Sequence, residues 1–198
     1  MQKIVFASHN PNKVAEIRQM LPPGVEVLSL DDIGCTQDIP ETADTLEGNA
    51  YLKASYVKEH YGFDCFADDT GLEVDALDGA PGVWSARFAG PGGDARANME
   101  KLLQLLEGKT NRKARFRTVI ALALGESYHY FEGVAEGEIL ERRTGDGGFG
   151  YDPVFRPHGH TGSFAQMTPQ EKNLISHRGL AFRKFKAFMD EIVPRKGG

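Results

Sequence analysis

Two adjacent carboxylates, Asp68 and Asp69, directly follow the short apolar run Cys65-Phe66-Ala67. The run predicts a buried strand, so the pair is expected to stand where that strand ends. Like charges this close raise each other's pKa, and the arrangement is costly unless something positive lies beside it. A divalent cation is a common solution, and Mg²⁺ prefers hard oxygen ligands while keeping several waters. The pair is equally compatible with a solvated acidic corner of a strand–turn–strand.

The residues after the acidic pair constrain the chain further. Leu72, Val74 and Ala76 alternate with charged residues, a pattern typical of a half-buried strand. The Gly-Ala-Pro-Gly run over residues 79–82 then predicts a turn.

Composition narrows the class of protein. The 198 residues suffice for one domain, or two closely packed lobes, with a full hydrophobic core. The net charge of −5 argues against a general binder of nucleic acid or anionic membranes, because such proteins need a basic surface. The chain has neither a run of 18 apolar residues nor a signal-peptide pattern, so we expect a cytoplasmic protein without a membrane partner. Cys35 and Cys65 have no metal-site spacing and are expected to be buried free thiols.

A polar segment, Ser8-His9-Asn10-Pro11-Asn12-Lys13, follows the first predicted strand, Lys3–Ala7. Asn10 suits the N-cap and Pro11 the first turn of a helix, and Pro22-Pro23-Gly24 ends that helix. The unpaired N–H groups and the dipole of a helix N-terminus form an anion site. The segment lacks the glycines of a P-loop, and by itself it favours a simple capped helix over an anion site.

Three motifs lie near the end of the chain. In Gly148-Phe149-Gly150-Tyr151-Asp152-Pro153, two aromatic residues flank a glycine, and such residues can stack on a nucleotide base or simply pack in a core. Thr168-Pro169-Gln170-Glu171 predicts a helix start. Lys172 in the first turns opposes the helix dipole, which indicates an anionic partner. Ser176-His177-Arg178-Gly179 predicts a break before the last helix.

Taken together and in this order, the motifs at residues 8–13, 68–87, 148–153 and 176–179 resemble the inosine/xanthosine triphosphate pyrophosphatase family, the Ham1-like enzymes for non-canonical purine nucleoside triphosphates. The resemblance runs from about residue 3 to about residue 190. It implies an α/β fold in which an elongated mixed β-sheet with flanking helices forms two lobes around a central cleft, with residues 1–198 as a single domain of two lobes. It implies hydrolysis of ITP, dITP, XTP and dXTP to the nucleoside monophosphate and pyrophosphate, which removes deaminated purines from the nucleotide pool. It also implies a homodimer.

The resemblance further implies roles for individual residues. Asp69 is a metal ligand, the general base, or both, and Asp68 supports it. A second carboxylate holds the Mg²⁺ cofactor with Asp69; Glu41 and Glu47 both qualify, and we favour Glu41. The residues implied in substrate binding are Ser8, His9, Asn10, Pro11, Asn12, Lys13, Thr70, Phe149, Gly150, Tyr151, Asp152, Lys172, His177 and Arg178.

These substrate-binding residues divide by the part of the nucleotide that they are expected to contact. Lys13 and Lys172 are expected to hold the phosphates. Residues 149–152 are expected to bind base and ribose, and His177 and Arg178 are expected to contact the edge of the base.

Three other functions stay open on the sequence. One is a metal-dependent pyrophosphatase for another altered base, as in the distantly similar Maf-type group. A non-catalytic nucleotide-binding module is the second, and the intact Asp68-Asp69 pair argues against it. The third is a nucleic-acid-binding domain, which the net acidity of the chain opposes.

The rest of the chain predicts ordinary elements. Expected are a strand at Val25–Leu30, a loop over 34–42, a helix opened by Asp44 and ended by Gly62, a helix capped by Asp94 and ended by Gly108, long strands over 112–124 and 128–140, and a frayed terminus at 195–198.

Overall fold

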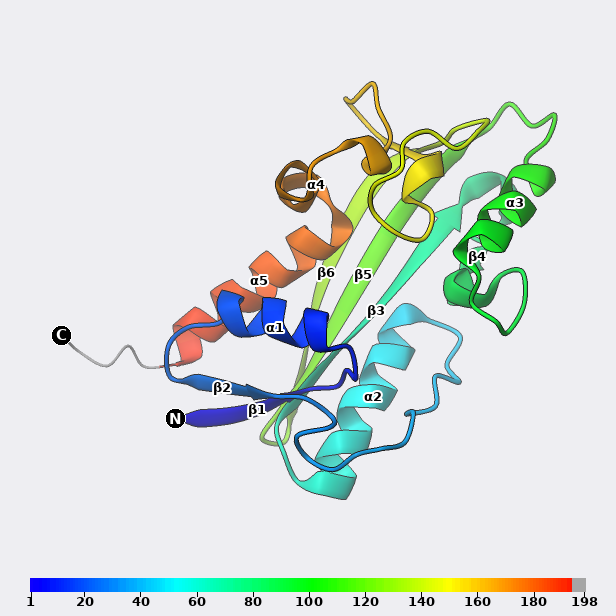
Figure 1. The fold of residues 1–198 in the computed structure, drawn as a ribbon. Helices are drawn as coiled ribbons and strands as arrows, with labels where there is room; N and C mark the ends of the chain where they lie inside the picture. Colours follow the sequence, from blue (N-terminus) through cyan, green and yellow to red (C-terminus); the bar gives the residue numbers. More distant parts are fainter. Residues whose placement is uncertain (194–198) are drawn as a thin grey trace. The chain divides into compact units, whose positions relative to one another are not determined.

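The computed structural model describes residues 1–193, so the fraying expected at 195–198 lies outside the described residues. Within them the chain forms an α/β fold around a seven-stranded mixed sheet of order β2-β1-β3-β5-β6-β7, with β4 paired to β3 (Figure 1). The strands are β1 (Gln2–Phe6), β2 (Val25–Leu28), β3 (Cys65–Val74), β4 (Pro81–Gly82), β5 (Lys113–Leu124), β6 (Ser127–Ile139) and β7 (Phe155–Pro157). The α-helices are α1 (Pro11–Met20), α2 (Leu46–Tyr61), α3 (Ala95–Leu105), α4 (Pro169–Ile175) and α5 (His177–Ile192). The predicted mixed-sheet α/β fold is confirmed.

The chain divides into two compact units. Unit 1 comprises Met1–Asp69, Val119–Glu132 and the chain from Ala181 onward, and unit 2 comprises Thr70–Thr118 and Gly133–Leu180. Strands β3, β5 and β6 and helix α5 therefore each contribute residues to both units. None of the helices within residues 1–193 has the length and apolar composition of a membrane-spanning segment.

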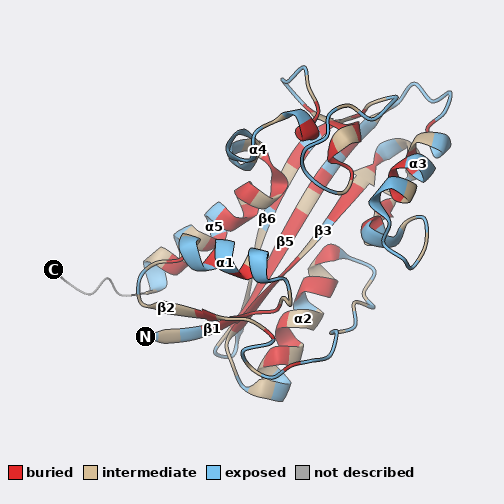
Figure 2. Ribbon diagram, viewed as in Figure 1, coloured by how far each residue is buried: buried red, intermediate tan, exposed pale blue. Residues whose placement is uncertain are grey.

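In unit 1 both faces of the sheet are covered. Ile4 and Phe6 pack in a core with side chains of α1 and α5, whereas Val5 and Ala7 pack in a second core with side chains of α2. Helices on both faces explain why these strands are continuous apolar runs rather than alternating ones. Figure 2 accordingly draws β3 and β5 largely in the buried colour, whereas β2 is mostly intermediate. Cys35 and Cys65 are buried free thiols in the second core, as expected.

In unit 2 only one face of β5 packs against a hydrophobic core. Ala114 and Phe116 face the core, where they meet the apolar stripe of α3. Arg115 and Arg117 point away from it and pair with Glu73, at 3.4 Å and 3.0 Å respectively. The alternation of basic and apolar residues predicted this half-buried strand, and the prediction is confirmed.

The acidic pair does not end its strand, and that prediction was wrong. Strand β3 continues through Asp68 and Asp69 to Val74. Two contacts join β3 to its neighbours here. The hydroxyls of Thr70 and of Thr118 in β5 are 2.8 Å apart, and the ammonium of Lys53 in α2 donates to the backbone carbonyl of Asp68 at 2.5 Å. A cation supplied by a neighbouring helix therefore lies beside the two carboxylates within a continuous strand.

Two helix boundaries also differ from prediction. The N-cap of α2 is Thr45, not Asp44, because the Thr45 hydroxyl accepts the backbone N–H of Gly48 at 3.0 Å. The break before the last helix consists of Ser176 alone, and α5 begins at His177. By contrast, the capping box that Thr168 forms at the start of α4 is confirmed.

Candidate functional site

The sheet register brings two of the predicted motifs to one edge of unit 1. Strands β1 and β3 pair in parallel, with Val5 opposite Cys65 and Phe6 opposite Phe66. The carboxyl ends of parallel strands lie at the same edge of a sheet, where α/β proteins place their ligands. The Ser8–Lys13 loop therefore lies beside the acidic pair, and the Lys13 ammonium is 4.0 Å from the Asp68 carboxylate.

The Ser8–Lys13 loop uses several of its hydrogen-bonding groups internally. The side chain of Asn10 caps α1, accepting the backbone N–H groups of Asn12 at 3.0 Å and Lys13 at 3.2 Å. The Ser8 hydroxyl accepts the N–H of Asn10 at 3.1 Å and keeps its own proton to donate. The predicted N-cap and N1 proline are confirmed, and the donors that the segment offers to an anion include the Ser8 hydroxyl and the Lys13 ammonium. The substrate-binding role of this loop stays a prediction.

Lys53 of α2 lies at the centre of the charged cluster in unit 1. Its ammonium is 3.3 Å from the Glu41 carboxylate and donates to the Asp68 carbonyl at 2.5 Å. The side chain is only 14% exposed, so its charge is weakly screened. Lys53 therefore provides the positive charge that the two adjacent carboxylates require.

Asp69 is the most perturbed carboxylate of this cluster. Burial raises the pKa of Asp69 to about 6, with smaller upward contributions from the charges of Glu41 and Asp68. Lys53 and a hydrogen bond from Asn49 act in the opposite direction. The Oδ2 atom of Asp69 is buried and makes no hydrogen bond to the described residues. A half-satisfied carboxylate of this kind is suited to bind a cation or accept a proton.

Sequence reasoning missed Asn49 and Lys53. Asn49 is 1% exposed, and its side-chain oxygen accepts the N–H of Ala43 at 2.9 Å, which fixes the segment that carries Glu41. A signal existed in the pattern. The two residues lie four apart on α2, among the positions of its buried stripe, and polar residues on such a stripe need buried partners.

The structure bears on which of Glu41 and Glu47 is the second carboxylate beside Asp69. The Glu41 carboxylate contacts Lys53 at 3.3 Å, and the charges of Glu41 and Asp68 contribute to the raised pKa of Asp69. Glu47 lies in the first turn of α2, where a negative charge complements the helix dipole. The geometry favours Glu41 beside Asp69, and its metal-binding role stays a prediction.

Unit 2 contains a pocket of about 320 Å³, within the size range of small-molecule sites. Its walls include Thr70, Phe116, Phe149 and His177. The His177 ring stacks on the Phe116 ring, with 4.6 Å between their centres and 16° between their planes. His177 is 6% exposed, and its Nδ1 atom is buried and makes no hydrogen bond to the described part of the chain. The ring therefore has one polar atom without a partner at the wall of the pocket.

The charge state of His177 follows from its surroundings. Burial, with the positive charges of Lys172 and Arg178, lowers the pKa of His177 to about 3. The imidazole is therefore neutral at physiological pH and provides one donor and one acceptor. Arg178 follows His177 on α5 but is not among the described residues that line the pocket.

Lys172 and Asp152 form a buried ion pair at the pocket. The Lys172 ammonium is 2.5 Å from the Asp152 carboxylate, whose side chain is 4% exposed. The same carboxylate accepts the N–H of Phe149 at 3.0 Å, and the ammonium lies 4.5 Å from the centre of the Phe149 ring. The prediction that Lys172 holds phosphates stays a prediction; in this structure its partners are a carboxylate and aromatic rings.

The two aromatic residues of the Phe149–Tyr151 run have different environments. Tyr151 is buried, and its hydroxyl donates to the Ser85 carbonyl at 2.7 Å, so it is a wall residue fixed by its own hydrogen bond. Phe149 is 69% exposed and has free ring surface for stacking. A side chain at Gly148 would lie 2.2 Å from the Asp152 carboxylate, which explains the glycine before Phe149.

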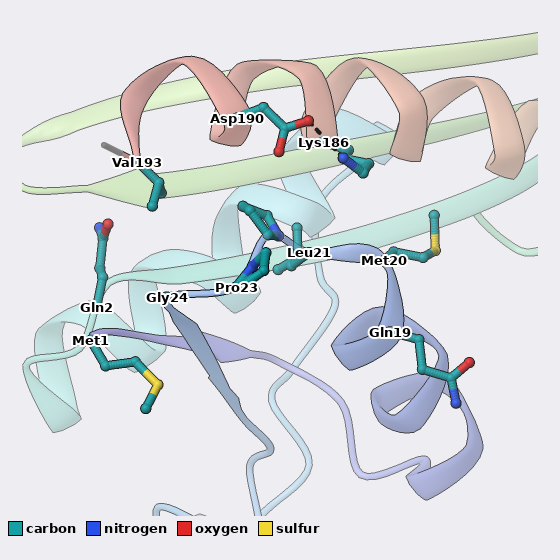
Figure 3. A pocket seen from close by; sticks show the side chains of 11 residues that line it. Met1, Gln2, Gln19, Met20, Leu21, Pro23, Gly24, Lys186, Asp190 and Val193 are labelled. Atoms are coloured by element: carbon teal, nitrogen blue, oxygen red, sulfur yellow. Dashed lines mark hydrogen bonds and ion pairs between the residues drawn. The ribbon is translucent and has the colours of Figure 1, made fainter. Parts of the chain in front are cut away.

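A larger hollow of about 1050 Å³ lies in unit 1 and has a different character (Figure 3). Its walls include Met20, Leu21 and Val193, and its charged residues, Lys186 and Asp190, pair with each other at 2.6 Å. Among the described residues around it there is no cluster of like charges and no buried polar atom without a partner. Size alone therefore does not identify the functional site.

Gly179 is expected to be essential for placing His177. A Cβ atom at Gly179 would lie 1.9 Å from the backbone oxygen of Asn173, and the Gly179 N–H donates to the Ser176 hydroxyl at 3.0 Å. Gly179→Ala should force α4 and α5 apart and lower the free energy of unfolding by about 1–3 kcal/mol. Thermal unfolding measures the loss. Gly92→Ala, which meets no atom within 4 Å, is the matched control, and equal stability of the two variants would contradict the packing.

The fold and these two groups of residues define an α/β protein with an acidic cluster beside a strand-to-helix loop and an aromatic pocket with buried polar groups. Residues 4–188 match the model of the Ham1 family. A protein of Christiangramia forsetii named dITP/XTP pyrophosphatase is 56% identical over 189 residues, covering 96% of this chain and 100% of its own. A protein of the same name from Porphyromonas gingivalis is 57% identical over 190 residues, covering 96% and 98%.

Solved structures agree with these relatives. The Ham1 protein of Staphylococcus aureus superposes with a TM-score of 0.92 at 37% identity, covering 96% of this chain and 99% of its own. A nucleoside-triphosphatase, dITP/XTP pyrophosphatase, from Mycobacterium abscessus gives 0.84 at 43% identity, covering 93% and 98%. The chain belongs to the Ham1 family.

Proposed function

We propose that this chain hydrolyses non-canonical purine nucleoside triphosphates, namely ITP, dITP, XTP and dXTP, to the nucleoside monophosphate and pyrophosphate. The activity removes deaminated purines from the nucleotide pool. The observation that carries the proposal is the pocket of unit 2, whose aromatic walls hold the buried, unpartnered Nδ1 of His177. Asp69 of the acidic cluster and Thr70 of the pocket wall are consecutive residues of strand β3.

The polar groups at the pocket support a preference for 6-oxo purines. Neutral His177, on the wall of the pocket, can donate from one ring nitrogen. Inosine and xanthosine offer the acceptor O6 where adenine offers an amino donor. Against adenine, two donors would face each other without water, and a lost buried pairing costs roughly 1–3 kcal/mol. Exposed Phe149 is available to stack on the base.

The cluster in unit 1 supports a hydrolytic role. Asp69, with its pKa raised to about 6, is largely ionised at neutral pH and close enough to neutrality to take a proton from an attacking water. The water attacks the α-phosphorus, and the bond to the β-phosphate breaks, with pyrophosphate as leaving group. Lys13 and Lys53 offset the negative charge of the phosphates. Positioning and electrostatics supply most of the acceleration in phosphoryl transfer, so this set of groups suffices.

A divalent cation, Mg²⁺, fits these residues. The free Oδ2 of Asp69 is an unused hard ligand, and Glu41 is the second carboxylate that affects it. Among residues 1–193 no three acidic, histidine or cysteine side chains form a ready metal cage. Two carboxylates suit Mg²⁺, which completes its shell with waters and substrate phosphates. When bound, the ion would neutralise phosphate charge and polarise the reacting water.

The direct test is pyrophosphate release from a panel of triphosphates, with and without Mg²⁺. We expect ITP, dITP, XTP and dXTP to be hydrolysed and ATP to be a poor substrate. Preference for a modified pyrimidine triphosphate would favour the Maf-type alternative. Tight binding of ITP with Mg²⁺ but no pyrophosphate would favour a non-catalytic module.

His177 is expected to carry base selectivity independently of pH. Because its pKa of about 3 lies far below neutrality, its donor–acceptor pattern is constant across the range in which an ordinary histidine titrates. His177→Phe should lower the ITP-to-ATP ratio of kcat/KM by roughly 5- to 150-fold, mainly by slowing ITP. The wild-type ratio should be flat between about pH 6 and about pH 8. A ratio that titrates in this interval would contradict the assignment.

Arg178→Ala is the companion variant. Arg178 is not on the pocket wall among the described residues, so the ratio should change less than in His177→Phe. We also propose that the protein is cytoplasmic and that it forms a homodimer; the homodimer is what its family resemblance implies. Light scattering that gives the mass of one chain would contradict the dimer.

A further inference from the structure

His9 lies in the loop between β1 and α1, and both of its ring nitrogens are bonded to one neighbouring segment. Its Nδ1 is 2.9 Å from the carboxylate of Asp31, and its Nε2 is 3.2 Å from the backbone carbonyl of Gln37. Both partners belong to the stretch that follows β2 and leads to Glu41. The ring thus forms a bridge between the loop of Ser8–Lys13 and this stretch.

The chemistry of the two partners determines the protonation of the ring. An ionised carboxylate and a peptide carbonyl only accept hydrogen bonds, so both ring nitrogens must donate. A neutral imidazole has one N–H and can satisfy only one of them. The geometry therefore requires the imidazolium form, with a positive charge on His9.

The surrounding charges agree with this geometry. The charged groups that face the ring are Asp31 and Asp38, both acidic. The Asp31 hydrogen bond raises the pKa of His9 above its ordinary value of 6.5, and the Gln37 carbonyl and the charge of Asp38 add to it, while burial opposes them. The Lys13 ammonium, a cation of the same loop, forms its ion pair with the Asp68 carboxylate.

The stretch that His9 contacts is anchored to other parts of unit 1. The N–H of Leu30 donates to the Ser8 carbonyl at 3.3 Å, and the Tyr56 hydroxyl donates to the Gln37 side chain at 3.3 Å. Losing the His9 bridge would leave the Ser8–Lys13 loop tied to this stretch mainly by the single backbone bond of Leu30. The loop would then position its Ser8 hydroxyl and Lys13 ammonium less well.

We propose that His9 is a positioning residue, an imidazolium bridge to Asp31 and Gln37 that holds the Ser8–Lys13 loop in its triphosphate-binding arrangement. His9 was expected from the sequence to bind substrate; here its two donors are already used. The positioning part rests on the proposed function, whereas the charged bridge does not. Because the pKa in the folded state exceeds 6.5, the bridge is complete below that value and is lost as the pH rises through the folded-state pKa.

The charge of His9 is tested without any nucleotide. Two-bond ¹H–¹⁵N correlation spectra of the full-length, ¹⁵N-labelled protein report the protonation of each ring, and the His9 signals are those missing from His9→Gln. We expect both His9 nitrogens to be protonated below a titration midpoint that lies above 6.5. A midpoint at or below 6.5, or a single neutral tautomer in that range, would overturn the bridge.

The positioning role is tested by the pH dependence of KM for ITP. In wild type, KM should rise about two- to fivefold as the pH passes the His9 midpoint, with kcat much less affected, since a partly exposed ion pair has a modest effect. Asp31→Asn keeps an acceptor but removes the charge, so the rise in KM should occur at lower pH; this pH-dependent rise is called the KM step. His9→Gln, which cannot donate from two ends, should have a raised KM at every pH and no KM step.

His60→Gln is the matched control. His60 is an exposed histidine of unit 1, and its Nδ1 atom contacts the Tyr56 carbonyl at 2.9 Å. This variant should keep the wild-type KM step. A KM step that persists in His9→Gln would overturn the positioning role even if the ring is charged. If no triphosphate releases pyrophosphate, the proposed function fails, and the spectra still decide the bridge.

Discussion

Asp69→Asn is expected to reduce pyrophosphate release from ITP by about 10³-fold or more, because one change removes both the proposed base and a proposed cation ligand. The amide keeps the shape of the carboxylate, and its oxygen can still accept the hydrogen bond from Asn49. It carries no negative charge and cannot accept a proton from water. Near-normal pyrophosphate release would remove Asp69 from the mechanism.

The same substitution is expected to stabilise the metal-free protein. The folded-state pKa of about 6 lies above the ordinary value of 3.8, so ionised Asp69 destabilises the fold at neutral pH. Asp69→Asn should therefore raise the free energy of unfolding by up to about 3 kcal/mol near neutrality. The gain should fall to roughly half at about pH 5, where folded Asp69 is mostly protonated.

Denaturant unfolding in the presence of a chelator measures this gain at both pH values. Asp75→Asn is the matched control, because Asp75 is an exposed carboxylate of unit 2 and its change should have little effect on stability. A gain that is absent, or that grows as the pH falls, would contradict the burial of Asp69 as the cause of its raised pKa.

Asp152→Ala is expected to be the most destabilising change in unit 2. It leaves the Lys172 ammonium, which is 16% exposed, without its buried counter-charge and removes the acceptor for the Phe149 N–H. Breaking one partner of a buried pair costs about 3–5 kcal/mol. For a chain of this size the melting temperature should fall by roughly 10 °C.

Two further variants separate the causes. Asp152→Ala with Lys172→Met removes the stranded charge and should recover part of the loss. Glu138→Ala breaks the pair of Glu138 with Arg156, whose side chains are each 40% exposed, and should cost at most about 1 kcal/mol. Equal melting temperatures for Asp152→Ala and Glu138→Ala would show that the Asp152–Lys172 pair has no special role.

Much of the fold follows from local sequence patterns. The apolar run of β1, the Asn10 cap and the capping box at Thr168 depend on neighbouring residues, and each was predicted correctly. The end of β3 was not, because a polar Asp-Asp pair reads as a strand terminus. In the folded chain Lys53, 15 residues before Asp68, supplies a charge at that point, and the Thr70–Thr118 contact joins the continuing strand to β5.

The candidate site shows the same division. Motifs that are contiguous in sequence, such as Ser8–Lys13 and Phe149–Asp152, could be found from the chain alone. The pattern of α2 marks Asn49 and Lys53 as polar residues that need buried partners, but their partner Asp69 becomes evident only when α2 packs beside β3. The pairing of Lys172 with Asp152 also depends on folding, because 20 residues separate the two partners.

The most direct test of the proposed activity is the ³¹P NMR spectrum of the products formed from ITP by the full-length protein with Mg²⁺. Inosine monophosphate and pyrophosphate are expected in equal amounts, with an equimolar addition of ATP left largely intact. In ¹⁸O-labelled water, the label should enter the monophosphate, because attack is at the α-phosphorus. Formation of inosine diphosphate and orthophosphate would contradict attack at the α-phosphorus, and equal consumption of ATP would contradict the selectivity for non-canonical purines.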